Sequence, residues 1–265
     1  MTKKKILVLA LTIAMVAILA VGGSLAYLTD TQSATNTFTL GNIKIVLNEQ
    51  QKGANGEPEA FSQNKVLKPG KSNDGNAVSK IVSVTNDCEE DVWVWVELEI
   101  PSYLVSADYK KAPHKDESKN ALHWNSYGCF NVEYFGKGYD KLAKADGIID
   151  EAGNTLVEGM VAYNADNAWY DYKFVSANEE YVTIRTMMKS KLPAGKTTLP
   201  CLAQVYMDWR VKVDENNMYL LPDGTSISTN TTDKPWKINV KAYAIQADGI
   251  DTVEAAVDAY NNNGK

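Results

Sequence analysis

Alternating apolar and polar residues predict β-strands along much of the chain. The clearest run is 92–100, where every second residue is apolar and the positions between carry Trp93, Trp95, Glu97 and Glu99. A period of two places the two sets on opposite faces of a strand. The apolar set is expected in the core, and the Trp pair on a half-covered face, beneath the following insertion or a partner chain. Further strands are predicted at 38–47, 81–86, 130–135, 169–175, 181–188, 202–213 and 236–247.

Turn residues separate these strands. Pro193-Ala194-Gly195 is typical of a turn, and residues 177–180 predict a hairpin between two neighbouring strands. Residues 101–170 follow no clean period, apart from the strand at 130–135, so a long insertion is expected there. Because helices do not alternate with the strands, a doubly wound α/β fold is excluded. The pattern predicts an all-β, two-sheet, jelly-roll-like sandwich formed by a single domain over residues 27–265.

The C-terminal end has the pattern of a helix. Asp251 is placed to cap its first turn and Glu254 follows at the third position. Four residues share one helical face: Val253, Ala256, Val257 and Tyr260. We expect this short helix to lie on the sandwich as a plug.

The first residues have the organisation of a signal peptide. Lysines at positions 3–5 precede an apolar run over 6–21, and residues 22–26 (GGSLA) follow it with a small-residue cleavage site of the Ser-x-Ala kind. The alternative is a retained membrane anchor, but a span needs about 20 residues and the run is shorter. We predict a signal peptide over 1–26, cleaved between Ala26 and Tyr27, which gives a secreted chain with no membrane contact after cleavage.

Charge and cysteine content restrict the partners. The chain has 27 basic and 33 acidic residues, and loss of the three leader lysines leaves a net charge of −9. An acidic surface argues against nucleic acid and anionic membranes as partners. Cys88, Cys129 and Cys201 allow at most one internal disulfide. We interpret them as small buried hydrophobic residues.

Several segments resemble a known family. Residues 26–30 (AYLTD) and 36–43 (NTFTLGNI) are similar to the start of TasA/camelysin proteins, which a SipW-type signal peptidase exports in Gram-positive bacteria. The turn at 67–70 (LKPG), the strand at 82–86 (VSVTN) and the closing segment 240–249 (VKAYAIQADG) add to the resemblance. It covers about half of the chain, and the segment 101–170 has no counterpart in it.

The resemblance implies a jelly-roll subunit of extracellular fibres or biofilm matrix. It also implies polymerisation, in which the mature N-terminal segment of one subunit completes an open sheet edge of the next. The implied partners are further copies of the chain, the SipW-type peptidase during export, and other matrix components. The candidate donor segment is 27–37, and the candidate assembly residues are Tyr27, Leu28, Thr29, Asp30, Phe38 and Leu40.

Catalytic chemistry finds little support. Camelysin relatives are described as metalloproteases, but the chain lacks an H-E-x-x-H motif and has two histidines, His114 and His123. Both are expected in exposed loops, without an evident carboxylate to orient them. We therefore predict no enzymatic activity, no cofactor and no metal.

Two acidic groups leave alternatives open. Glu97 and Glu99 beside the Trp pair resemble a sugar-binding or glycosidase site as well as a solvated strand face or subunit contact. The acidic loop 87–91 could hold calcium or be solvated. The first prediction is a structural protein; the second is a cell-surface binding module or adhesin that uses residues 101–170 and the face of Trp93 and Trp95.

Overall fold

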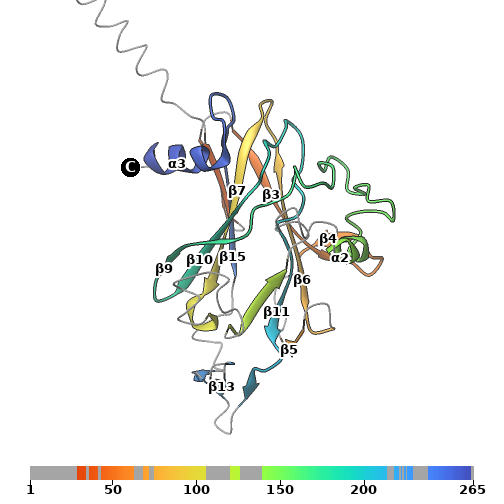
Figure 1. The fold of residues 1–265 in the computed structure, drawn as a ribbon, viewed down its shortest axis with the longest axis vertical. Helices are drawn as coiled ribbons and strands as arrows, with labels where there is room; N and C mark the ends of the chain where they lie inside the picture. The colour runs from red at the N-terminus through yellow and green to blue at the C-terminus, as the bar shows by residue number, and fades with distance from the viewer. Residues whose placement is uncertain are drawn as a thin grey trace, which may run out of the picture.

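The computed structural model describes residues 29–33, 36–40, 43–62, 68–71, 75–105, 120–125, 139–213, 218–220, 222, 224, 226–228 and 238–263. These residues form two large β-sheets, a small third sheet and a helix near the C-terminus (Figure 1). The predicted all-β, two-sheet sandwich with a short C-terminal helix is confirmed.

The first sheet is antiparallel and contains the first and the last strand of the described chain. Its order is β2-β1-β15-β7-β10-β9. The strands are β1 (Thr29–Ser33), β2 (Asn36–Leu40), β7 (Val92–Pro101), β9 (Lys173–Ala177), β10 (Tyr181–Met187) and β15 (Asn239–Gln246).

The second sheet has the order β4-β3-β6-β11-β5, and β8 also pairs with β11. Its strands are β3 (Ile45–Lys52), β4 (Pro58–Ala60), β5 (Pro69–Gly70), β6 (Val78–Asn86), β8 (Leu122–Asn125) and β11 (Leu202–Asp208). The small sheet consists of β12 (Lys212–Val213), β13 (Met218–Leu220) and β14 (Ser226–Ser228). The helices are the 3-10 turn η1 (Ser102–Leu104), α2 (Tyr139–Ala145) and α3 (Val253–Asn263).

The core between the two large sheets follows the predicted alternation. On β7, Val94, Val96 and Leu98 are buried in the same cluster as Val84 of β6 and Val240 of β15. β-branched and leucine side chains pack well on a pleated surface that is covered by a second sheet. The prediction that the apolar face of 92–100 forms the core is confirmed.

Two predicted strands are divided in the structure. The segment 38–47 belongs to β2, which ends at Leu40 in the first sheet, and to β3, which begins at Ile45 in the second. The alternation changes phase at this boundary, from Phe38 and Leu40 to Ile43, Ile45 and Leu47, so a single strand over 38–47 was the wrong prediction. The segment 202–213 is interrupted after Asp208 by a turn at 209–210. The predicted hairpin is confirmed as β9 and β10, while the strand predicted at 130–135 lies outside the described residues.

The described part of the predicted insertion contributes to the core. Ala143 of α2, Ile149 and Trp169 are buried in the main cluster. The indole nitrogen of Trp169 donates to the carbonyl of Leu199 at 2.7 Å. At Gly147, where φ is +71°, an added Cβ would lie 2.5 Å from a backbone oxygen, so the close approach requires glycine. Residues 139–170 therefore form an irregular layer of the body.

Candidate functional site

Strand β15 is where both ends of the chain meet. On one side it pairs with β7 from Asn239↔Glu99 to Gln246↔Val92. On the other side it pairs with β1, from Thr29↔Ile245 to Ser33↔Lys241, and β2 pairs with β1 in turn. The N-terminal hairpin thus completes the sheet. Without it, β15 would present a row of unpaired backbone groups.

The predicted assembly residues lie partly in this hairpin. Thr29 and Asp30 belong to β1, and Phe38 and Leu40 belong to β2, where they pair with Thr31 and Thr29. Ala26, Tyr27 and Leu28 lie outside the described residues.

The expected open edge is closed within the chain, because the sheet takes up its own N-terminal segment. Pairing within one chain avoids the entropy cost of association. Donation to a neighbour would therefore require the hairpin to leave its own β15.

The residues of β1 match the buried row of β15 poorly. Ala242 and Ala244 are fully buried. Opposite them β7 places Val96 and Val94, whereas β1 has Gln32 and Asp30 at the corresponding register positions. Polar side chains gain little free energy when they are buried against apolar ones. At these two register positions β1 therefore has polar residues where β7 has valines.

Trp93 and Trp95 lie beneath α3. They are 5% and 1% exposed, so the face that was predicted to be half-covered is almost fully covered, and neither ring of the candidate binding face is open to a ligand. The indole nitrogen of Trp93 donates to the carbonyl of Ile250 at 3.0 Å. Trp95 stacks on Tyr243, with ring centroids 5.6 Å apart, and meets the Tyr260 ring edge-on at 5.2 Å. The cover is the C-terminal helix, as predicted for a plug, and not the insertion.

The start of α3 differs from the prediction in one detail. The hydroxyl of Thr252, rather than the carboxylate of Asp251, accepts the backbone hydrogen bond of Ala255 at 3.2 Å. The predicted helical face is confirmed: Val253, Ala256 and Val257 are buried, and Tyr260 is partly buried.

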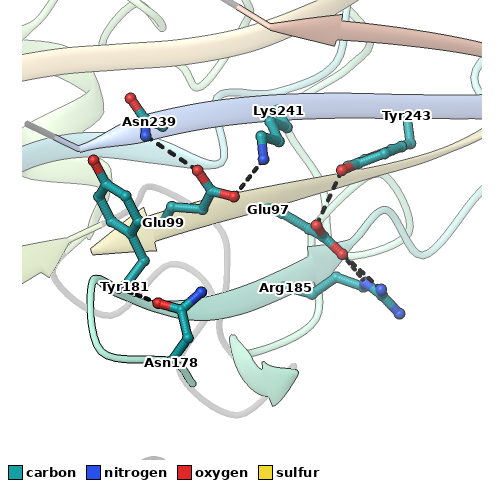
Figure 2. Close-up of polar contacts among 8 residues, drawn as sticks. All are labelled: Glu97, Glu99, Asn178, Tyr181, Arg185, Asn239, Lys241 and Tyr243. Atoms are coloured by element: carbon teal, nitrogen blue, oxygen red, sulfur yellow. Dashed lines mark hydrogen bonds and ion pairs between the residues drawn. The ribbon is translucent and has the colours of Figure 1, made fainter. Parts of the chain in front are cut away.

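A ladder of charged and polar side chains continues along the same face beyond the Trp pair (Figure 2). Glu97 accepts hydrogen bonds from Nε and Nη2 of Arg185 at 2.9 and 2.6 Å, and from the hydroxyl of Tyr243 at 3.1 Å. Glu99 accepts one from Asn239 at 3.1 Å and forms an ion pair with Lys241. These contacts join β10, β7 and β15 side by side.

The ladder serves strand pairing rather than acid–base chemistry. Each carboxylate pairs with a cation on a neighbouring strand: Glu97 with Arg185, its register partner, and Glu99 with Lys241, which lies diagonally across on β15. Both are stabilising cross-strand arrangements. Burial, and then the charge of Glu97, raise the pKa of the Tyr243 hydroxyl above its ordinary value. The hydroxyl stays protonated and donates to Glu97. A glycosidase arrangement, with one carboxyl acting as the acid beside a free nucleophile or base, is not what these contacts provide.

His123 differs from its prediction. It lies on β8 and not in a loop, and its Nε2 is 3.0 Å from Oδ2 of Asp208. Arg210 binds the same carboxylate, with Nε 2.9 Å from Oδ1 and Nη2 2.8 Å from Oδ2. The expectation that no carboxylate orients this histidine is therefore wrong. His114 lies outside the described residues.

The Asp208 carboxylate is fully engaged by these neighbours. Burial acts to raise its pKa, but the hydrogen bonds from Arg210 and His123 outweigh burial and hold the pKa below its ordinary value. The His123 ring also stacks on Tyr206, at 5.3 Å between centroids. The spacing of Asp208 and Arg210 could have indicated a local pair. His123 is 85 residues away, so only the fold brings it to them.

The remaining candidate groups give no further site. In the described ranges, no group of three or more His, Cys, Asp or Glu side chains is close enough to hold a metal ion. Cys201 is buried, as predicted, Cys88 is only partly buried, and Cys129 lies outside the described residues. Among the residues that the structure describes, no helix has the length and apolar character needed to cross a membrane.

Comparison with known proteins adds no relative: no family model, no curated protein and no solved structure matches the chain.

Proposed function

We propose that the chain is a secreted structural protein of the TasA type, a subunit of extracellular fibres or biofilm matrix that assembles by donating its N-terminal strand. In this proposal it has no catalytic role. The observation that carries the proposal is the edge of β15, which is covered by a short strand at the very start of the described chain. A terminal strand can leave without breaking the pairing of β15 with β7.

Exchange of the hairpin between chains costs little free energy because the number of strand contacts stays the same. A hairpin that leaves its own β15 and pairs with the β15 of a neighbour makes the same hydrogen bonds again. Since each chain both gives and receives a hairpin, the contact is head-to-tail and can continue into a filament.

The predicted cleavage site fits this arrangement. Cleavage between Ala26 and Tyr27 would make Thr29, the first residue of β1, the third residue of the mature chain. An N-terminus released so close to the strand can enter a neighbouring sheet without trailing a leader. Export and assembly would then be ordered, with polymerisation following cleavage.

A deletion tests the proposal. The mature chain, residues 27–265, should form fibres visible by electron microscopy, and a chain lacking 27–37 should remain a folded monomer by circular dichroism and light scattering. Fibres formed by the deleted chain would exclude donation by this segment.

A cysteine pair distinguishes exchange from pairing within one chain. Ser33 and Lys241 are register partners, so Ser33→Cys with Lys241→Cys can form a disulfide across the two strands. Oxidation of monomers should lock the hairpin in place and prevent fibres. Oxidation of assembled fibres should give a ladder of covalent multimers on a non-reducing gel. Ser33→Cys alone is the matched control. If oxidised fibres of the double variant contain no covalent multimers, strand donation is refuted.

One observation favours the second candidate, a cell-surface binding module. Trp209 is 60% exposed, and the Lys71 ammonium lies 5.3 Å from its ring centroid. An exposed indole beside a cation can stack on a sugar. Glycan binding that is lost in Trp209→Ala, with no fibres from the mature chain, would favour this function over the first.

A further inference from the structure

One tryptophan of the described chain is largely exposed to solvent. Trp209 is 60% exposed. The other tryptophans that the structure describes are fully or partly buried: Trp93, Trp95, Trp124 and Trp169. An indole in water forgoes the burial that stabilises those residues. Because large aromatic side chains are enriched where proteins bind ligands and partners, the surface around Trp209 is a candidate contact site.

The turn that carries Trp209 is held in place on both sides. Asp208 is buried at the end of β11, and its Oδ1 accepts the backbone N–H of Arg210 at 2.8 Å. The carbonyl of Asp208 accepts the N–H of Val211 at 3.1 Å, and His123 lies 3.0 Å from Oδ2 of the same residue. The indole therefore projects from a fixed backbone. Ligands bind to a fixed side chain at a smaller cost in conformational entropy.

Basic residues are concentrated around this turn, although the chain as a whole is acidic. Segments 68–71 and 207–213 contain four basic residues and one acidic residue, in a chain of net charge −6. The acidic residue is Asp208, which is buried. The Lys71 ammonium lies 5.3 Å from the Trp209 ring centroid, and Lys68 and Lys212 are exposed. The surface thus combines an apolar ring with local positive charge.

Strand pairing brings the two segments together. β5 runs parallel to the end of β11, with Gly70 opposite Asp208, and Lys71 and Trp209 are the next residues of the two segments. Figure 1 shows β5 beside the end of β11, at the opposite end of the sandwich from α3. Both strands belong to the second sheet, whereas the N-terminal hairpin completes the first. The surface at Trp209 is therefore separate from the edge of β15.

The chemistry of this surface fits a carboxylated sugar. The C–H face of a pyranose ring packs on an indole, and a carboxylate on that ring pairs with an ammonium beside the indole. Nucleic acid fits less well, because proteins bind single strands through several stacked aromatic rings along a basic groove. Segments 68–71 and 207–213 contain a single aromatic residue, on a molecule whose net charge repels a long polyanion.

We propose that Trp209 and the lysines around it bind an acidic polysaccharide, a polymer of sugars that carry carboxylates. This inference rests on the proposed function, because an exported matrix protein is the one that meets such a polymer, and it names the class of matrix component that the chain would hold. A fibre repeats the site in every subunit. One polymer that spans several sites is then held more tightly than by a single chain.

Calorimetry with acidic oligosaccharides tests the site. The mature chain, residues 27–265, is titrated at low ionic strength with oligomers of galacturonic, glucuronic and mannuronic acid. Their methyl esters keep the rings and lack the charge, so they are the matched ligands. We expect saturable binding of at least one acid, about tenfold or more tighter than binding of its ester, and weaker binding as salt is raised. Binding of none of the acids, or equal binding of acid and ester, would overturn the proposal.

Substitutions assign the binding to this surface. Trp209→Ala should lower the affinity at least about tenfold, Trp209→Phe should recover part of it, and Lys71→Gln should lower it several-fold. Leu156→Ala, at a residue that is 59% exposed, and Lys196→Gln, beside Asn86 at the far end of β6, are the matched controls and should bind normally. Circular dichroism checks that each variant is folded. Normal binding by Trp209→Ala would contradict the proposal.

Two further ligands separate recognition of sugar from attraction of charge. Polyglutamate and a single-stranded DNA oligonucleotide should both bind more weakly than the acidic oligosaccharide. Tighter binding of either would assign the surface to an acidic polypeptide or to nucleic acid and overturn the proposal. Electron microscopy of Trp209→Ala should still show fibres, because β1 and β15 are unchanged. Fibres without sugar binding would refute this inference alone, and sugar binding without fibres would refute strand donation alone.

Discussion

The two ends of the chain close on the same strand in different ways. The N-terminal hairpin covers the edge of β15, and the C-terminal helix covers its outer face. Tyr243 takes part in both contacts: it is the register partner of Thr31 in β1, and its ring lies edge-on to Tyr260 of α3 at 5.5 Å. One strand therefore carries two terminal covers whose stabilising interactions can be compared directly.

The comparison separates backbone pairing from side-chain packing. β1 pairs through backbone groups, with polar residues opposite the buried alanines, whereas α3 fits its side chains against the rings of Trp93 and Trp95. Backbone pairing tolerates many sequences, so an edge can accept an equivalent strand from another chain. Packing against large rings is selective. We therefore expect substitutions under α3 to affect stability most, and substitutions in β1 to affect assembly most.

The largest effect is expected from Trp95→Ala. Removing a fully buried indole that contacts Tyr243 and Tyr260 should lower the free energy of unfolding by about 3–5 kcal/mol. Chemical denaturation measures this change. Trp209→Ala, at the exposed tryptophan, is the control and should change stability by less than about 0.5 kcal/mol. Equal effects of the two substitutions would mean that α3 does not cover Trp95 in solution.

A smaller loss should follow when the ladder between the two covers is broken. Arg185→Met leaves Glu97, which is mostly buried, without its cation, and should cost about 2 kcal/mol in the free energy of unfolding. Lys44→Met, which removes the exposed pair with Asp87, should cost less than about 1 kcal/mol. If both substitutions lower the free energy of unfolding equally, burial does not make the Arg185–Glu97 pair more stabilising than the exposed pair.

Alkaline pH should weaken the helix cover through Tyr243. Its raised pKa in the folded chain means that the unfolded chain loses this proton first, above the ordinary value of 10.0. The corresponding stability is complete below that pH and is lost as pH rises, at up to about 1.4 kcal/mol per pH unit. The Tyr243→Phe variant cannot ionise at this position. Between about pH 9 and about pH 11 its free energy of unfolding should therefore fall by about 1.4 kcal/mol less than that of the unsubstituted chain. Identical pH dependence of the two proteins would exclude this contribution.

The smallest effect on the single chain is expected from Thr31→Pro. Proline removes one backbone donor of β1 and should cost about 1 kcal/mol of stability, because the hairpin is a terminal element. Fibre formation should nevertheless be lost, since the donated strand could no longer pair fully. Thr31→Val keeps the donor and should assemble normally. Normal fibres from Thr31→Pro would show that β1 is not the assembling strand.

Local patterns predicted the elements well where one face was clearly apolar. The alternation over 92–100 and the helical face from Val253 to Tyr260 are both as expected. The prediction failed at 38–47, where the apolar positions shift by one residue across Gly41-Asn42. This break in the alternation separates two strands that lie in different sheets. It also missed the packing of 139–170, where irregular backbone contributes isolated residues such as Trp169 to the core.

The candidate sites were less predictable because they join distant residues. The alternation placed Trp93 and Trp95 on the face of the strand that points away from the core, and the C-terminal helix was expected as a plug. Neither pattern could show that the helix covers these two residues. His123 was assigned to an exposed loop because the surrounding segment follows no clean period. Its partners, Asp208 and Arg210, follow more than 80 residues later and gave no local signal. Contacts of this kind depend on strand register across the sheets, which a local pattern does not contain.

The sequence by itself determined which residues of each strand and of α3 are apolar, and therefore which faces had to be buried, because side-chain period follows from backbone geometry. Only the tertiary structure decided what buries them: β1 at the edge of β15, α3 over Trp93 and Trp95, and Arg185 opposite Glu97. The reason is physical. Burial of apolar surface is non-directional and specifies no partner, whereas strand register and chain connectivity select one partner from several that would satisfy the same pattern.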